Sequence, residues 1–262
     1  MDLQLRDKVA LVVGSNGGIG AGIAEALAAE GCRLVLTGRD EGRLAAQAKT
    51  LAKDGVEPST LRCDLEDPTQ AEAAVRATES KFGRLDLIAF CAGNAKRGGM
   101  DEVGDADIES TLQVKLMGPV RLVRAALPGM RARKFGRIVL IGGLNGRNPS
   151  GGAIVGGAVN AGMANFARQA AKEVAGSGIT INVVDPGSTR TARWERGLDQ
   201  LQEQHGLNRE EAEARASARL PLRRPVEPAE IADLVLFLSS PRTVAINGTI
   251  IPVDGGSSEG LY

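Results

Sequence analysis

Short apolar runs alternate with longer amphipathic stretches along most of the chain. The apolar runs are rich in Val, Ile and Leu without alternating polar positions, which is typical of strands buried on both faces of a parallel sheet. The predicted strands are Val9–Val13, Arg33–Thr37, Ser59–Arg62, Leu85–Ala89, Arg137–Ile141, Ile179–Val184 and Thr249–Val253. The predicted helices cover residues 18–30, 41–54, 68–82, 105–132, 158–175 and 228–239.

This alternation predicts an α/β fold: a single doubly wound domain of the Rossmann type over residues 1–262, with helices on both faces of a parallel sheet. Asp67 and Pro68 suit the N-cap and the first position of the third helix. Ligands of such sheets bind beyond the carboxyl ends of the strands, so we expect the functional site at that edge.

One segment interrupts the alternation. From Thr189 to Pro225 the chain is densely charged and has little apolar periodicity. It follows the sixth predicted strand and therefore lies beside the ligand edge. Long connections at such places are often functional, so we expect a lid-like insertion at about 189–225.

Composition narrows the function classes. Lys plus Arg and Asp plus Glu both total 32, and this balance argues against a nucleic-acid partner. Cys32, Cys63 and Cys91 form no CxxC pair, so we expect free thiols with neither a disulfide framework nor a metal site. No signal peptide and no run of about 18 apolar residues is visible, which predicts a soluble cytoplasmic protein without a membrane span.

A glycine-rich turn follows the first predicted strand and opens the first helix, with the sequence Gly14-Ser15-Asn16-Gly17-Gly18-Ile19-Gly20. Glycines at 14, 18 and 20 allow a sharp turn and the close approach of a diphosphate to the helix N-terminus. The turn therefore predicts dinucleotide binding. A purely structural glycine turn is the alternative.

Two further positions refine the predicted ligand. Arg39 follows the second strand, where an acid commonly holds the ribose 2′-hydroxyl of NAD; a guanidinium there suits the 2′-phosphate of NADP. NADP is thus predicted over NAD, with a solvated surface arginine as the alternative. Asp64 follows the third strand and either accepts from the adenine amino group or is an ordinary turn residue.

Several motifs in order resemble the short-chain dehydrogenase/reductase family over about residues 5–258. They are Gly14–Gly20, Asp64-Leu65, Ala92-Gly93, Asp185-Pro186-Gly187, Arg224-Pro225 and Val253-Asp254-Gly255-Gly256. The resemblance implies a seven-stranded parallel sheet, a small-molecule substrate and a homo-oligomer, commonly a tetramer. It also implies a cofactor site formed by Gly14, Ser15, Asn16, Gly18, Ile19, Gly20, Arg39, Asp64, Leu65, Ala92, Gly93, Pro186, Gly187, Thr189 and Thr191.

The catalytic positions of the family differ in this chain. Gly143 stands at the Ser position, Gly156 at the Tyr position, Asn160 at the Lys position and Lys115 at the position of the family's helical Asn. No shift of register restores the tyrosine, because Tyr262 is the only one in the chain.

The Asn and Lys types have thus exchanged places. In the family these two positions face each other across the site. We therefore hypothesise that Lys115 places its ammonium near the ribose or the substrate, with Asn160 hydrogen-bonding alongside; the alternative is a Lys115 that reaches solvent. His205, the only histidine, lies in the charged insertion and is a poor candidate acid.

Two functions remain open from the sequence. The first is an NADP-linked oxidoreductase that acts on an unknown carbonyl or alcohol substrate through a non-standard site. The second is a non-redox protein on the same scaffold, either a nucleotide-binding module or an enzyme such as a lyase, because fold alone does not decide function.

Overall fold

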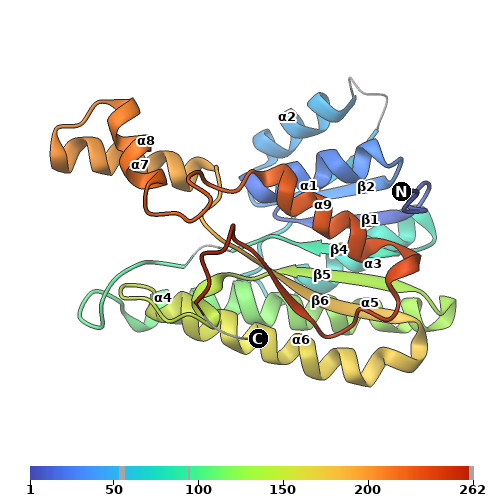
Figure 1. Cartoon of the computed structure of the whole chain (residues 1–262). Helices are drawn as coiled ribbons and strands as arrows, with labels where there is room; N and C mark the ends of the chain where they lie inside the picture. The colour runs from blue at the N-terminus through green and yellow to red at the C-terminus, as the bar shows by residue number, and fades with distance from the viewer. Residues whose placement is uncertain (53–56, 94, 260–262) are drawn as a thin grey trace.

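The computed structural model describes residues 1–52, 57–93 and 95–259. Its centre is a seven-stranded sheet in the order β3-β2-β1-β4-β5-β6-β7, and every neighbouring pair is parallel (Figure 1). The strands are β1 Val9–Val13, β2 Arg33–Gly38, β3 Ser59–Arg62, β4 Leu87–Phe90, β5 Gly136–Ile141, β6 Ile179–Pro186 and β7 Ile250–Val253. The doubly wound Rossmann-type sheet predicted from the sequence is confirmed.

Helices cover both faces of this sheet. One face carries α1 (Gly18–Ala29), α2 (Glu41–Ala52) and α9 (Pro228–Ser239). The other carries α3 (Gln70–Phe82), α5 (Gly118–Arg133) and α6 (Ile154–Val174), and α4 (Asp105–Leu112) precedes α5. The two layers bury two separate apolar cores, one on each face.

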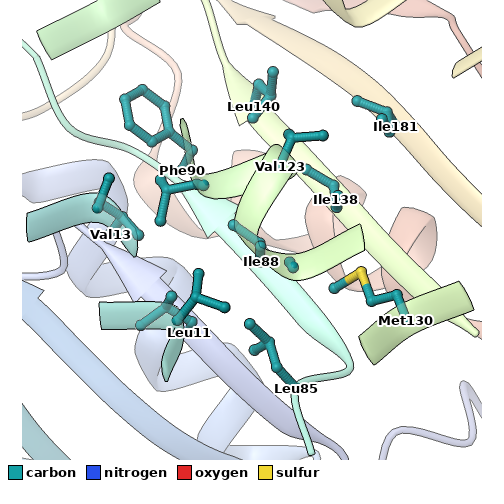
Figure 2. Packing of buried hydrophobic residues seen from close by; sticks show 14 of the residues in the cluster. Leu11, Val13, Leu85, Ile88, Phe90, Val123, Met130, Ile138, Leu140 and Ile181 are labelled. Atoms are coloured by element: carbon teal, nitrogen blue, oxygen red, sulfur yellow. The ribbon is translucent and has the colours of Figure 1, made fainter. Parts of the chain in front are cut away.

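Strand β1 shows how the chain fills both cores. Ala10 and Val12 point to the α1 and α9 side, whereas Leu11 and Val13 point to the α3 and α5 side. Successive side chains of a strand point to opposite faces, and helices cover both faces of the sheet, so all four are buried. Figure 2 shows the second core, in which Leu11 and Val13 lie beside Ile88 and Phe90 of β4 and several side chains of the flanking elements.

Some predicted boundaries are wrong. The fourth strand spans Leu87–Phe90 rather than 85–89. The third helix begins at Gln70 with Thr69 at the N-cap, although the Asp67 carboxylate does accept from Thr69 N at 2.9 Å. The second predicted helix ends at Ala52, and its last two residues, 53 and 54, lie outside the described residues.

The long helix predicted over 105–132 contains an irregular turn. A π-helical segment, η1 (Gln113–Met117), separates α4 from α5, so the backbone there makes wider hydrogen-bonded turns. Such π segments occur often at functional sites. Lys115 lies at the middle of this one.

The charged insertion contains two helices, α7 (Ala192–His205) and α8 (Arg209–Ser217), where the apolar pattern predicts none. They project beyond the carboxyl ends of the strands (Figure 1). Ion pairs hold them, since Arg209 of α8 bonds both Glu195 and Asp199 of α7. That this insertion acts as a lid remains a prediction.

An arginine lies inside β5. Arg137 is 2% exposed, and its guanidinium donates to the backbone carbonyls of Gly136, Gly178, Ser240 and Pro241 over 2.9–3.3 Å. It thereby ties the sheet to the segments that follow α6 and α9.

Among the described residues, no helix has the length and apolar character needed to cross a bilayer.

Candidate functional site

The turn between β1 and α1 is an open cradle. Gly14 has φ +81°, and a Cβ there would lie 2.7 Å from the Ala92 backbone; a Cβ on Gly20 would lie 2.1 Å from Gly14 O. No side chain caps the N-terminus of α1. Its first backbone N–H groups are therefore available to an anion, and the positive end of the helix dipole favours one.

The other residues of this turn have different surroundings. Ser15 is fully buried, and its hydroxyl lies 3.4 Å from Thr37 O of β2. Asn16 lies against Gly38, at the end of β2. Ile19 packs its side chain against the apolar core. Among these three predicted cofactor residues, Asn16 has the side chain best placed to face a ligand.

The start of α7 closes the other side of the cradle. A Cβ on Gly18 would lie 2.4 Å from Thr191 Cγ2, so the glycine turn and the segment after β6 are in contact. Thr191 is the N-cap of α7 and accepts from Arg193 N at 3.3 Å. Thr189 donates to Gly187 O at 2.9 Å. The segment from Pro186 onward thus reaches the glycine turn, and its part in cofactor binding remains a prediction.

The ends of β2 and β3 lie together at the same edge. Arg39 is exposed and reaches Glu66 at 4.0 Å. Asp64 accepts from Glu66 N at 3.2 Å, while Leu65 is buried in the core. The Arg39 guanidinium is therefore accessible to a phosphate, which would compete with the Glu66 carboxylate for it.

A buried polar network lies further along the sheet edge. Lys115 Nζ donates to Asn160 Oδ1 at 2.7 Å, and Asn160 Nδ2 donates to Asn145 Oδ1 at 2.7 Å. Lys115 is 9% exposed and Asn160 is 6% exposed. The alternative in which Lys115 reaches solvent is wrong, and the two exchanged side chains are in direct contact.

The Lys115 stem lies over the turn that follows β4. A Cβ on Gly93 would come 2.3 Å from Lys115 Cγ, and Gly93 has φ +125°. Only glycine combines this backbone conformation with the space that the lysine stem needs. Ala92, its neighbour, is the residue that contacts Gly14. Lys115 therefore meets the cofactor cradle through this turn.

Burial changes the proton affinities of the site. The pKa of Lys115 is lowered to about 8, chiefly by burial and then by the nearby Arg193, while Asp185 opposes the shift. Burial also raises the pKa of Asp185, whose Oδ1 accepts from Gly143 N at 2.9 Å. At neutral pH Lys115 is thus a cation that releases its proton more readily than an ordinary lysine.

Two glycines lie beside the network. A Cβ on Gly143 would lie 2.8 Å from Asn160 Nδ2, and one on Gly156 would lie 3.0 Å from Asn145 Nδ2. The two asparagine amides therefore fill the space beside these glycines. Gly143 and Gly156 bring no side-chain chemistry of their own.

A match to a known family covers nearly all of the chain, including the residues of this site. The family described as Enoyl-(Acyl carrier protein) reductase matches residues 13–258. The chain belongs to the short-chain dehydrogenase/reductase family.

Individual short-chain dehydrogenases/reductases agree with this assignment. The 3-oxoacyl-[acyl-carrier-protein] reductase FabG of Escherichia coli is 31% identical over 254 residues, which cover 97% of this chain and 98% of that protein. The L-sorbose reductase of Gluconobacter frateurii, solved with NADPH and L-sorbose, is 30% identical with a TM-score of 0.95 and full coverage of both chains. An actinorhodin polyketide ketoreductase variant solved with NADPH is 32% identical with a TM-score of 0.90, covering 95% of this chain and 97% of its own.

The sequence does not predict three residues as members of this site. They are Asn145, Asp185 and Arg193, although Asp185 belongs to one of the family motifs. The signal for Asp185 is an acid at the end of a buried strand on the ligand edge. Asn145 has no such signal, because it lies in a short 3₁₀ turn, η2 (Leu144–Gly146), whose geometry the sequence does not specify.

The three thiols and His205 do not join the network. Burial raises the pKa of the Cys91 thiol to about 12, so it stays protonated. Cys32 and Cys63 are buried free thiols whose pKa values burial also raises, to about 12 and about 11. His205 is exposed at the end of α7. Among the described residues, no group of His, Cys, Asp and Glu is arranged to hold a metal ion.

Proposed function

We propose that this chain is an NADPH-dependent carbonyl reductase whose proton donor is Lys115. The observation that carries the proposal is the buried hydrogen bond of 2.7 Å between Lys115 Nζ and Asn160 Oδ1. It joins the two positions that carry the helical Asn and the Lys in the family. A cation and an amide are therefore both retained at the site, each from the opposite helix.

The cofactor cradle fits a dinucleotide. Gly14, Gly18 and Gly20 leave room for a diphosphate at the uncapped start of α1, and Arg39 is accessible to a 2′-phosphate. Thr191 and its neighbours would hold the nicotinamide end. When bound, NADPH supplies the hydride for reduction. The solved relatives that contain NADPH support this choice over NAD.

The proton chemistry departs from that of the family. Gly143 and Gly156 stand at the Ser and Tyr positions and cannot exchange a proton. Lys115 is protonated at neutral pH and gives its proton from Nζ to the carbonyl oxygen of the substrate. Proton transfer by a positioned group typically contributes roughly 100- to 10,000-fold to the rate. Asn160 and Asn145 are positioning residues that hold the ammonium in place.

The non-redox alternative receives no support from these comparisons. The relatives named above are all reductases.

We further propose a homotetramer, as the resemblance implies, and mass measurement by light scattering during gel filtration tests it. The identity of the carbonyl substrate follows from a screen rather than from the fold.

The test combines NADPH binding with turnover. NADPH fluorescence titration measures the affinity, and a carbonyl panel is then screened for cofactor oxidation. Lys115→Met should lower kcat by roughly 100-fold or more while NADPH affinity changes little. Lys172→Met, an exposed substitution of the same kind on α6, is the control and should leave both values unchanged.

The pH profile gives an independent readout. Because the pKa of Lys115 is about 8 in the free protein, kcat/KM for reduction should fall as the pH rises through that value, and Lys115→Met should abolish this step. The charged groups that act on Lys115 are Arg193 and Asp185. NADPH binding without oxidation by any carbonyl would contradict the proposal.

A further inference from the structure

The reductase site carries a local excess of positive charge, although the chain as a whole is neutral. Lys115 lies buried in η1. Arg193 and Arg196 lie in the first two turns of α7. Arg97 lies on the connection between β4 and α4. Three segments that are distant in sequence thus bring four cations to one edge of the sheet.

These cations act on one another. The start of α7 and Lys115 lie at the same cradle, since a Cβ on Gly18 would lie 2.4 Å from Thr191 Cγ2 and one on Gly93 would lie 2.3 Å from Lys115 Cγ. In agreement with this placement, Arg193 lowers the pKa of Lys115, and burial followed by Arg97 and Arg196 lowers the pKa of Arg193. Figure 1 shows α4 and α7 at the same end of the molecule, beyond the carboxyl ends of the strands. The buried Asp185 offsets part of this charge, but its carboxylate already accepts from Gly143 N.

The position of Arg193 is unfavourable within its own helix. It is the second residue of α7, after the N-cap Thr191. The N-terminus is the positive end of a helix dipole, where acidic side chains are stabilising and cations are not. Local rules of this kind are broken chiefly at functional or strained sites.

Two other arginines near α7 form ion pairs within the chain. Arg190 bonds Glu213 and Glu227, and Arg224 bonds Glu230. Carboxylates in and next to the insertion therefore pair with Arg190 and Arg224. Among the described residues, no ion pair includes Arg97 or Arg196.

We propose that the carbonyl substrate of this reductase carries an anionic group, a carboxylate or a phosphate, which Arg193 binds beside Lys115. This inference rests on the proposed function. The planar guanidinium binds carboxylate and phosphate oxygens in pairs, so both groups satisfy the same chemistry. An anion at this point also offsets the repulsion between Arg193 and Lys115, so Lys115 stays protonated in the complex with substrate.

The test uses matched anionic and neutral carbonyls. Acetoacetate is compared with methyl acetoacetate, and dihydroxyacetone phosphate with dihydroxyacetone. Calorimetry measures their binding to the full-length protein saturated with NADP⁺, where both partners are oxidised and no hydride moves. One or both anions should bind about 10- to 100-fold more tightly than the neutral counterpart. The pair with the larger difference distinguishes carboxylate from phosphate.

Variants assign the effect to Arg193. Arg193→Gln should remove most of the preference for the anion and leave the binding of the neutral compound unchanged. The control Arg215→Gln makes the same charge change at an exposed position of α8 and should keep the preference. NADP⁺ affinity, measured in each variant, shows that the protein is folded and the cradle intact.

Two results would overturn the inference. One is equal affinity, or no binding, for the anionic and neutral members of both pairs. The other is an Arg193→Gln variant that weakens NADP⁺ instead of the carbonyl anion, which would assign Arg193 to the cofactor diphosphate. Failure of the proposed reduction is distinct from both, because anions would then bind while NADPH stays unoxidised.

Discussion

Lys115 carries a charge in a place that excludes most water. Its stem lies over Gly93 and its ammonium bonds Asn160, so the side chain is held rather than free to reach solvent. Removing an ammonium from water is costly, and the cost favours the neutral amine. The same burial that makes the proton easier to transfer therefore opposes folding.

This opposition makes stability depend on pH in a defined direction. Lys115 has a pKa of about 8 in the folded protein against the ordinary value of 10.5, so the unfolded chain holds the additional proton between these values. The native protein should lose about 2 kcal/mol relative to Lys115→Met as the pH falls from about 10 to about 8. Urea unfolding of both proteins across this range measures the difference. A constant difference would show that Lys115 titrates normally.

Restoring the family serine should not restore the family chemistry. In Gly143→Ser the new Cβ would lie 2.8 Å from Asn160 Nδ2, an amide that bonds Asn145. The substitution should therefore displace Asn160 and lower kcat about tenfold or more, because the Lys115 contact is disturbed. Gly151→Ser, at an exposed glycine with open space around it, is the control for carbonyl reduction. A Gly143→Ser enzyme that is faster than the native one would contradict this account.

At the scale of elements, apolar runs predict the strands well and charged helices poorly. Strand β1 matches its predicted bounds because its buried run ends abruptly at Gly14. Strand β3 also matches, although its four residues are half-buried or exposed. Helices α7 and α8 are absent from the prediction, because the dense charge hides the short apolar stripe of α7 at Trp194, Leu198 and Leu201. Ion pairs such as that of Arg209 with Asp199 join the two helices. The π segment at Lys115 is likewise invisible in a periodicity of 3.6.

Arg137 has a structural role, because it joins several elements of the fold. Its guanidinium donates to four carbonyls from three different segments. Arg137→Met would leave these acceptors unpaired in the interior, and we expect a loss of about 2–4 kcal/mol in the free energy of unfolding. Arg62→Met, on the exposed side of β3, should cost little. Denaturant midpoints of the two variants decide this, and similar midpoints would refute the bridging role.

At the scale of the whole molecule, the cofactor site is more predictable than the catalytic one. The cradle around Gly14 depends on backbone shape, which glycine spacing reports directly. The contact between Lys115 and Asn160 joins residues 45 positions apart, and only the family resemblance suggests that they meet. Asn145 and Arg193 depend on how a short turn and the insertion fold back over the sheet, which the chain pattern alone does not determine.

A ligand that joins the ends of several strands should stabilise the entire fold. At a hundredfold excess over its Kd, NADPH should add about 2.7 kcal/mol, or roughly 5 °C in Tm for a chain of this length. Arg39→Ala should reduce the shift with NADPH but not the smaller shift with NADH. Thermal unfolding with each nucleotide measures both effects. The absence of any shift would refute dinucleotide binding.

Gly93 couples two halves of the site that a mutational survey would treat as separate. A methyl group at this position would push against the lysine stem, while the change itself falls in a loop next to the nucleotide. Gly93→Ala would therefore be interpreted as a defect in cofactor binding, although we expect it chiefly to displace Lys115, the proposed proton donor. A double mutant that combines Gly93→Ala with a shortened side chain at position 115 would show this cause. The second substitution would add almost nothing to the loss of activity that the first produces.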